Sequence, residues 1–178
     1  VGSESGGTKK RYALIDEDGN MEIKGFEYVR GDWSEIAKET QEKILEYILK
    51  GREDKVLEFI RNVIKEVMLN KISKNKLIIT RQLTKNLKNY TQIAPHVKVA
   101  KDIEKLGIKV SRGMPIRYII TKDGKTISDK ARWYEYAKNY DEYYYINNQI
   151  IPSALRILSV LGYTKSDLLN EQKSLDKF

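Results

Sequence analysis

The sequence contains no cysteine and a single histidine, His96, among its 178 residues. The absence of cysteine excludes disulfides, iron–sulfur clusters and zinc sites built on thiolates, and it is typical of intracellular proteins. One imidazole excludes a metal site with several histidine ligands, and a Ser-His-Asp triad would have to use His96 itself. The chain therefore lacks several common means of catalysis.

Long apolar runs and catalytic motifs are also missing. No stretch approaches the ~18 apolar residues of a membrane-spanning helix, and the N-terminus has no apolar core of a secretory signal. The sequence contains no Walker-type glycine-rich loop, no G-x-S-x-G and no H-E-x-x-H. We expect an intracellular, cytoplasmic protein without a membrane partner, and no residue can be nominated as catalytic.

Positive charge is present in excess. There are 33 Lys and Arg residues against 25 Asp and Glu residues, a formal net charge of +8. Such an excess favours a polyanionic partner, either nucleic acid or an anionic membrane surface.

The apolar pattern predicts an α+β fold: a β-hairpin, then a mainly helical domain with a small inserted β-sheet. The hairpin should span residues 9–29 after a flexible leader, 1–8, because Asp18-Gly19 is a strong hairpin turn signal. Period 3.6 predicts two antiparallel helices over 34–50 and 53–71. The remaining expected elements are a strand at 76–80, a helix at 95–106, strands at 108–113, 114–120 and 126–128, a helix at 141–161 with a kink at Pro152, and a polar, mobile tail at 164–178.

The basic residues gather in four places. They are Lys9-Lys10-Arg11, Arg30, the group Arg81, Lys85 and Lys88, and the pair Arg112 and Arg117. Any single one of them is adequately explained as a solvated surface charge. The groups fall at loops and element ends beside Thr, Gln, Gly and Tyr, which favours contacts to phosphate and sugar whose strength falls steeply with salt.

Three other features have two interpretations each. Asp16-Glu17-Asp18 could bind Mg²⁺, but acidic residues are expected in a hairpin turn, which is the stronger interpretation. His96 follows Pro95 at a predicted helix start, where it could meet a phosphate or be an ordinary surface histidine. The tyrosines of residues 134–145 could stack on single-stranded bases, although core packing is the better explanation.

Four separated segments carry a resemblance to a known family. They are "TKKRYALID", "RGDWSEIAKETQEKILEYILK", "LTKNLKNYTQIAPHVKVAKDI" and "DEYYYINNQIIPSALRILSVLGY". In order and spacing they resemble the C-terminal part of archaeal family B DNA polymerases. The resemblance implies that residues 9–29 are the last hairpin of the palm and that residues 30–163 form the thumb, which wraps the primer–template duplex.

The resemblance also implies roles for individual residues. Lys9, Lys10, Arg11 and Tyr12 match a K-K-R-Y motif that holds the primer–template near the primer end. Arg30 matches the junction where the thumb begins. The segment that grips the duplex backbone is matched by Thr84, Lys85, Tyr90 and His96. Arg112 and Arg117 lie on the inserted sheet, where Ser-Arg-Gly replaces the R-P-G of many members and leaves that phosphate contact open.

The chain lacks the family's catalytic motifs. The metal-binding carboxylates lie N-terminal to the matching region, so this chain should hold no catalytic residue, metal or cofactor. It should be inactive alone, either a fragment or the small polypeptide of a naturally split polymerase whose larger partner binds Mg²⁺. The alternative is a free-standing basic module that binds nucleic acid or tethers a partner to the sliding clamp, without an enzymatic role.

The C-terminal segment "QKSLDKF" resembles the motif that docks on the sliding clamp PCNA. Gln172, Leu175 and Phe178 have the spacing that a helical turn needs to bring a polar group and two apolar anchors together. The usual second aromatic residue is missing.

Overall fold

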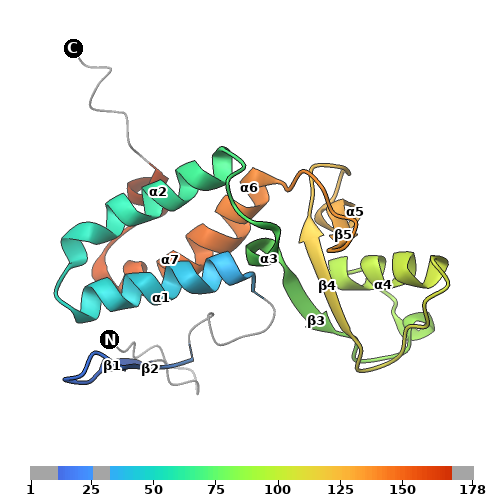
Figure 1. The fold of residues 1–178 in the computed structure, drawn as a ribbon, viewed down its shortest axis with the longest axis horizontal. Helices are drawn as coiled ribbons and strands as arrows, with labels where there is room; N and C mark the ends of the chain where they lie inside the picture. Colours follow the sequence, from blue (N-terminus) through green and yellow to red (C-terminus); the bar gives the residue numbers. More distant parts are fainter. Residues whose placement is uncertain (1–11, 26–32, 170–178) are drawn as a thin grey trace, which may run out of the picture.

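The computed structural model describes residues 12–25 and 33–169. They form two lobes side by side, with a small β-hairpin lying beneath one of them (Figure 1). We call the larger part, built on three long helical segments, the helical lobe, and the part built on a three-stranded sheet the sheet lobe. Mixed helices and small antiparallel sheets confirm the expected α+β class.

The hairpin consists of β1 (Tyr12–Ile15) and β2 (Met21–Lys24), paired antiparallel. The side chain of Asp16 holds the turn, accepting hydrogen bonds from the backbone N–H groups of Asp18 and Asn20 and from Asn20 Nδ2. The hydrogen bond from the Asn20 side chain is the main cause that lowers the pKa of Asp16. The predicted turn is therefore present, and the Asp16 carboxylate is occupied by hydrogen bonds from the turn. The buried face of the hairpin, Ala13 and Ile23, packs under the first helix.

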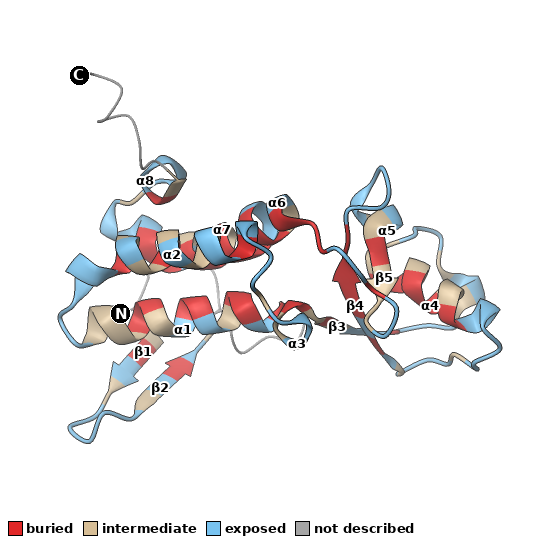
Figure 2. Ribbon diagram, turned by 45° about the horizontal axis from the view of Figure 1, so that its top comes forward, coloured by how far each residue is buried: buried red, intermediate tan, exposed pale blue. Residues whose placement is uncertain are grey.

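The helical lobe packs two antiparallel helices against a third. In chain order its first elements are α1 (Glu35–Leu49), η2 (Glu53–Lys55) and α2 (Val56–Met68). Later elements are α6 (Glu142–Tyr144), the π-helical turn η4 (Tyr145–Ile150), α7 (Ile151–Leu158), η5 (Ser159–Leu161) and α8 (Lys165–Leu169). Buried residues lie on the facing sides of α1, α2 and α7 (Figure 2). The two predicted antiparallel helices are confirmed.

The sheet lobe is an antiparallel sheet in the order β3–β4–β5, with a helix on one face. Its elements are β3 (Ile79–Gln82), η3 (Leu87–Asn89), α4 (Pro95–Lys105), β4 (Pro115–Ile120), α5 (Ile127–Lys130) and β5 (Ala131–Trp133). The short helix α3 (Lys74–Leu77) precedes them and packs on α1 of the helical lobe. Pro95 opens α4, where its missing N–H has no helical partner to lose. The predicted helix and inserted sheet are therefore present.

Several strand expectations are wrong. The strand expected at 76–80 begins only at Ile79, because residues 74–77 form the short helix α3. Residues 108–113 are not a strand, and 126–128 are not one either, since Thr126 caps α5 through a reciprocal bond with Asp129. The third strand instead comes from residues 131–133, at the start of the tyrosine-rich segment.

The C-terminal region also differs from expectation. The helix expected over 141–161 is divided into four pieces, and its π-helical turn ends just before Pro152, which lacks an N–H to donate into the preceding turn. The expected mobile tail does not begin at residue 164. Residues 165–169 form α8, whose Leu168 is fully buried and whose Asp167 carbonyl accepts a hydrogen bond from Arg61. Within the described ranges, no helix is long and apolar enough to cross a membrane.

Gly124 has the tightest backbone surroundings of the turns described. A Cβ at this position would lie 2.8 Å from the backbone carbon of Asp129 and 2.9 Å from the nitrogen of Lys130, at a φ of +148°. We expect Gly124→Ala to lower the free energy of unfolding by about 3 kcal/mol, because the clash is with backbone and the conformation is strained for alanine. Gly107→Ala, at φ +84° with open space around it, should cost about 1–2 kcal/mol. Denaturant unfolding measures both, and equal losses would contradict the expectation.

Candidate nucleic-acid interface

The end of β3 and the start of β4 bring together two loops that are far apart in the sequence. Thr80 pairs with Arg117 in the sheet, and Gln82 pairs with Pro115. Beyond the strands, Gly113 N–H donates to the Leu83 carbonyl at 2.7 Å, and Leu83 N–H donates to Met114 at 3.0 Å. The loop after β3 is thus fastened to the loop before β4, which sets Thr84 and Lys85 beside Arg112.

Tyr90 organises the first of these loops. Its hydroxyl accepts a hydrogen bond from Thr84 N–H at 2.9 Å and lies 3.3 Å from Thr84 Oγ1. The ammonium group of Lys85 sits over the ring, 5.3 Å from its centroid. The hydrogen bond with the Thr84 side chain is the main cause that lowers the pKa of Tyr90, and the charge of Lys85 acts in the same direction. The loop presents an exposed threonine and an exposed lysine on an aromatic support.

The two arginines of the strands occupy opposite faces of the sheet. Arg81 pairs with Ile116 and lies near enough to His96 of α4 for its charge to act on the imidazole. Arg81 therefore belongs to the face that α4 covers. Because neighbouring residues of a strand point to opposite faces, Arg117 belongs to the other face. Both side chains are exposed.

The side chain of His96 is buried, in contrast to the surface position expected for it. The residue is 4% exposed, its Nδ1 has no hydrogen-bond partner, and its ring meets Tyr90 edge-on at 6.0 Å. Burial, with a smaller contribution from Arg81, lowers the pKa of His96 to about 4, so the imidazole is neutral at pH 7. The expectation of direct phosphate contact is therefore not supported, because the side chain is buried where it would have to be accessible.

We call the exposed and half-buried polar and basic residues at this end of the β3–β4 pair, on both faces of the sheet, the sheet-end cluster. Its members are Arg81, Thr84, Lys85, Tyr90, Arg112 and Arg117. Across residues 12–25 and 33–169, none of Lys85, Arg112 and Arg117 forms an ion pair. The sequence contains no Asp or Glu over 67–101 or over 105–122, so these cations have no acidic neighbour in their own segments, whereas Lys76, Lys98 and Lys122 of the same segments reach Glu39, Asp102 and Glu142. This double gap in acidic residues is a signal that would have singled out the whole region, in which the sequence names Arg81 only as a member of one basic group.

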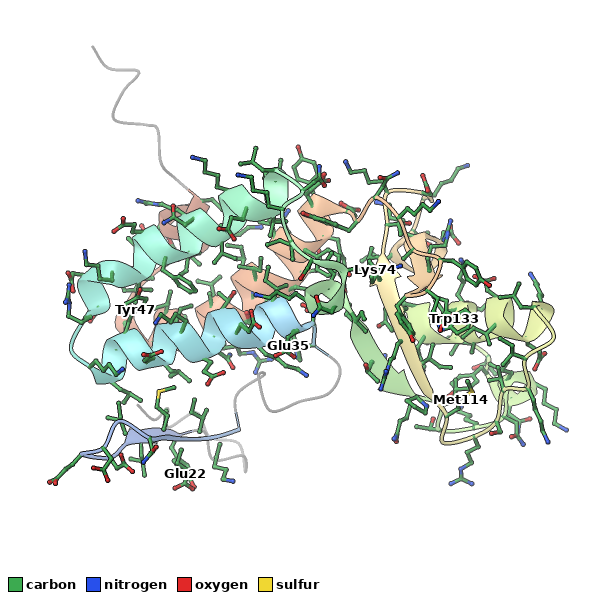
Figure 3. All side chains as sticks on the ribbon, in the orientation of Figure 1. Glu22, Glu35, Tyr47, Lys74, Met114 and Trp133 are labelled. Carbon is green, nitrogen blue, oxygen red and sulfur yellow. The ribbon has the colours of Figure 1, made fainter. Side chains whose placement is uncertain are left out.

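The hairpin lies along the same edge of the molecule as the sheet-end cluster. Figure 3 places Glu22 of β2 and Met114 of the loop before β4 on that edge, at opposite ends. Tyr12 begins β1 and its hydroxyl donates to Glu22 at 3.1 Å, so the hydroxyl is already engaged. This bond is the main cause that raises the pKa of Tyr12. Tyr12 is thus separate from the sheet-end cluster but on its side of the molecule.

Several predicted site residues lie outside the described ranges. They are Lys9, Lys10, Arg11, Arg30, Gln172, Leu175 and Phe178.

The tyrosine-rich segment divides between core and surface. Tyr145 is fully buried, Tyr140 is nearly so, and Tyr144 meets Tyr145 edge-on at 5.1 Å. These three support core packing, the interpretation favoured from the sequence. Tyr136 and Tyr143, in contrast, are 64% and 65% exposed.

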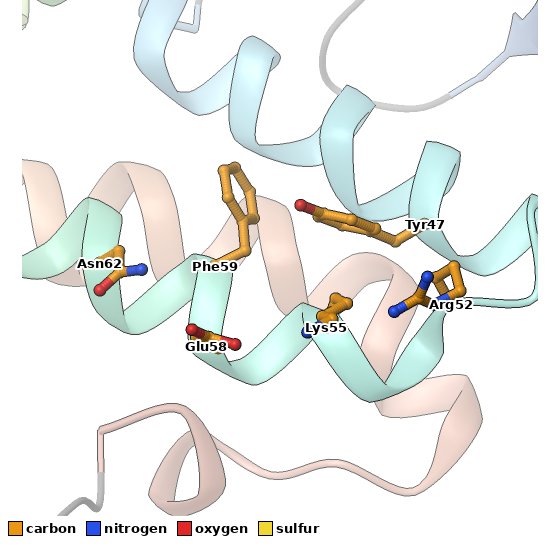
Figure 4. A pocket seen from close by; sticks show the side chains of 6 residues that line it. All are labelled: Tyr47, Arg52, Lys55, Glu58, Phe59 and Asn62. Carbon is orange, nitrogen blue, oxygen red and sulfur yellow. The ribbon is translucent and has the colours of Figure 1, made fainter.

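A pocket of about 380 Å³ opens between α1 and α2, away from the sheet lobe (Figure 4). Tyr47 and Phe59 form its aromatic part, with ring centroids 5.9 Å apart, and Lys55, Glu58 and Asn62 line the α2 side. None of the residues predicted as a site lies in it. Within the described ranges, no group of three His, Asp or Glu side chains is arranged to hold a metal ion.

Comparisons with known proteins identify the family. The model of DNA polymerase family B matches residues 7–161. The chain is 48% identical to a DNA polymerase of Thermococcus litoralis over 90% of its own length and 10% of the relative's. It is 47% identical to a DNA polymerase of Methanocaldococcus jannaschii over 96% of its length and 11% of the relative's.

A solved structure agrees with the sequence matches. The family B DNA polymerase of the hyperthermophilic archaeon Pyrobaculum calidifontis superposes with a TM-score of 0.77 at 36% identity, covering 89% of this chain and 21% of that one. The chain thus spans about a tenth of the length of the curated relatives and a fifth of the solved one. With the family model matching most of its residues, the chain belongs to DNA polymerase family B.

Proposed function

We propose that this chain is the part of a family B DNA polymerase that holds the primer–template duplex. It binds chiefly through phosphates and without sequence preference, while the catalytic carboxylates, Mg²⁺ and the nucleotide belong to the remainder of the polymerase. Residues 9–29 correspond in this proposal to the end of the palm and residues 30–163 to the thumb. One observation carries it: cations from two carboxylate-free segments, without ion-pair partners among the described residues, lie around the same end of the β3–β4 pair.

The chemistry of the cluster suits a nucleic-acid backbone. Guanidinium and ammonium groups bind phosphate oxygens, and threonine hydroxyls and exposed N–H groups add neutral contacts that carry no sequence information. The pocket between α1 and α2 is lined by none of the cluster's members. Lys9, Lys10 and Arg11, by their match to the K-K-R-Y motif, and Arg30, by its match to the start of the thumb, are proposed to add further contacts to DNA.

A larger polypeptide is the proposed partner in catalysis, since the chain covers a small part of its relatives. A mixture of this chain and the larger polypeptide, in the presence of Mg²⁺, should perform primer extension that neither part performs alone. If the mixture is no more active than the larger part, the proposal that this chain serves the polymerase reaction fails. The sliding clamp PCNA is proposed as a second partner, through Gln172, Leu175 and Phe178.

Fluorescence anisotropy with three labelled ligands tests the choice of nucleic acid. A primer–template duplex should bind more tightly than a single DNA strand or RNA of equal length, at several salt concentrations. A preference for single strands would instead favour base stacking on the exposed rings of Tyr136 and Tyr143. Such a result would replace the duplex-holding proposal with that of a single-strand-binding module.

Changing Lys9 and Lys10 to Ala should weaken duplex binding by about tenfold and reduce the slope of log K against log salt by about two, because each lysine neutralises one phosphate in the proposed complex. The measurement is a salt titration of both proteins between ~50 and ~200 mM. Replacement of Lys138 and Lys165, which are exposed elsewhere, is the matched control. An unchanged slope in the Lys9/Lys10 variant would remove these residues from the interface.

A further inference from the structure

The two lobes are connected where the chain passes between them twice. It crosses after α3, where Leu77 leads into β3, and again before α6, where Asn139 leads to Asp141 (Figure 1). The relative position of the helical lobe and the sheet-end cluster therefore depends on how these two crossings are held. A duplex that contacts both the hairpin and the sheet-end cluster would depend on that spacing.

One hydroxyl group ties the first crossing to the sheet. Tyr145 Oη donates to the Leu77 carbonyl at 2.7 Å and accepts from Ile120 N–H, at the end of β4, at 3.1 Å. The side chain is fully buried, and burial raises the pKa of Tyr145 well above its ordinary value, so it remains a donor. Breaking these two hydrogen bonds is costly, because the Leu77 carbonyl and the Ile120 N–H would be left buried with no water to replace the hydroxyl.

Backbone pairing and two ion pairs hold the second crossing. Thr121 forms an isolated bridge with Tyr140, and Asp141 N–H donates to the Ile120 carbonyl at 2.9 Å. The carboxylates of Asp141 and Glu142 are mostly buried, and they pair with Lys130 at 2.9 Å and Lys122 at 2.7 Å. Ile120 thus joins the two crossings: its N–H donates to the Tyr145 hydroxyl, and its carbonyl accepts from Asp141 N–H.

The same π-helical turn reaches the start of α1 through Gln149. Gln149 Oε1 accepts from Ser34 N–H at 2.9 Å and from Ser34 Oγ at 2.8 Å, and Nε2 donates to Tyr144 Oη at 3.1 Å. Ser34 and Gln149 are both buried, and Ser34 is the N-cap of α1. Because the hairpin packs on α1, these bonds hold α1, and the hairpin with it, against the π-helical turn. Tyr145 and Gln149 therefore hold two different junctions from one turn of helix.

We propose that Tyr145 and Gln149 are positioning residues, which together set the spacing between the hairpin and the sheet-end cluster so that both meet one DNA duplex. The inference rests on the proposed function for its purpose. The mechanical part stands on the hydrogen bonds alone, and it is measurable without DNA. Neither residue touches the duplex in this arrangement, because both are buried.

The absence of cysteine allows the spacing to be measured with introduced spin-label pairs. Glu42 on α1 and Lys105 on α4 are exposed and report the two lobes, while Glu17 in the hairpin turn and Asn147 on the π-helical turn, also exposed, report the position of the hairpin across the Ser34–Gln149 bonds. In the full chain, Tyr145→Phe should broaden the lobe distance distribution about twofold and leave the hairpin distribution unchanged, and Gln149→Leu should do the reverse. Asn148→Ala, exposed on the same turn, should change neither.

Duplex affinity provides the second readout. Both variants should bind about three- to tenfold more weakly than the parent chain, since a smaller fraction of molecules has the competent spacing, and Asn148→Ala should bind normally. Unchanged distance distributions in folded Tyr145→Phe and Gln149→Leu would overturn the positioning proposal. Broadened distributions with unchanged duplex affinity would leave the junctions established and count against the proposed function instead. If Tyr145→Phe does not fold, Glu142→Gln, which weakens the partly exposed pair with Lys122, carries the same expectation for the lobe distance.

Discussion

Replacing Lys85, Arg112 and Arg117 together with glutamine is expected to lower the affinity for duplex DNA by about 10²–10³-fold at moderate salt. The three cations have no carboxylate partner within the described chain, so they are available to phosphates. Each phosphate they neutralise releases bound counterions, and the slope of log K against log salt should fall by about 0.9 per contact, or nearly three in total. Anisotropy titrations at four or five salt concentrations give both quantities.

The control for this variant removes the same charge from another surface. Lys55, Lys65 and Lys71 are exposed before, on and after α2, outside the sheet-end cluster. Their replacement with glutamine should change affinity by less than about threefold, which is the effect of net charge acting at long range. Equal losses in the two triple variants would mean that overall charge, and not the cluster, drives binding. Glutamine retains most of the stem of lysine, so folding should be preserved in both.

Much of the fold could be predicted because local signals and tertiary demands agree there. The turn sequence Asp18-Gly19 predicts the hairpin, and Asp16 supplies the hydrogen bonds that such a turn needs. The apolar spacing of residues 34–50 and 53–71 predicts α1 and α2 to within a few residues, since each helix has one face in the core.

The errors occur where short segments take their structure from neighbours. Residues 76–77 have a strand-like composition but complete α3, which packs on α1, and pairing with β4 begins only at Ile79. Ala131–Trp133 becomes a strand because β4 offers a free edge, as the register Tyr118↔Trp133 shows. Strand pairing over a long separation in sequence is not encoded in the local pattern.

The residues of the candidate site could be nominated only in part, because tertiary packing decides which of them are exposed. Thr84, Lys85 and Arg112 could be nominated from residue type and motif, and the structure brings them together through the bonds between Leu83 and residues 113–114. The burial of His96 could not be read from the sequence, because position 96 lies beside Val97 at a helix start where either face could turn inward. The packing of α4 on the sheet decides it.

Burial of His96 predicts a distinct dependence of stability on pH. Its pKa is about 4 in the folded chain against 6.5 for an ordinary histidine. Well above pH 6.5, His96 is neutral in both the folded and the unfolded chain, so the free energy of unfolding does not depend on its titration. As the pH falls from 6.5 to 4, the unfolded chain binds a proton that the folded chain cannot accept, so the free energy of unfolding should decrease by about 3 kcal/mol.

Comparison with His96→Phe isolates this effect. Phenylalanine keeps the ring that packs edge-on against Tyr90 and cannot be protonated, so its stability should stay nearly level between pH 6.5 and 4.5. Hydrogen bonds from Asn20 and Lys50 lower the pKa values of Asp16 and Glu46, and the stability these groups contribute is lost only at lower pH and equally in both proteins. Urea unfolding at half-unit pH steps gives the difference between the two curves. Parallel curves would show that His96 is accessible to protons in the folded state, and a reduced salt slope of DNA binding in His96→Phe below pH 6 would then restore it as a phosphate contact.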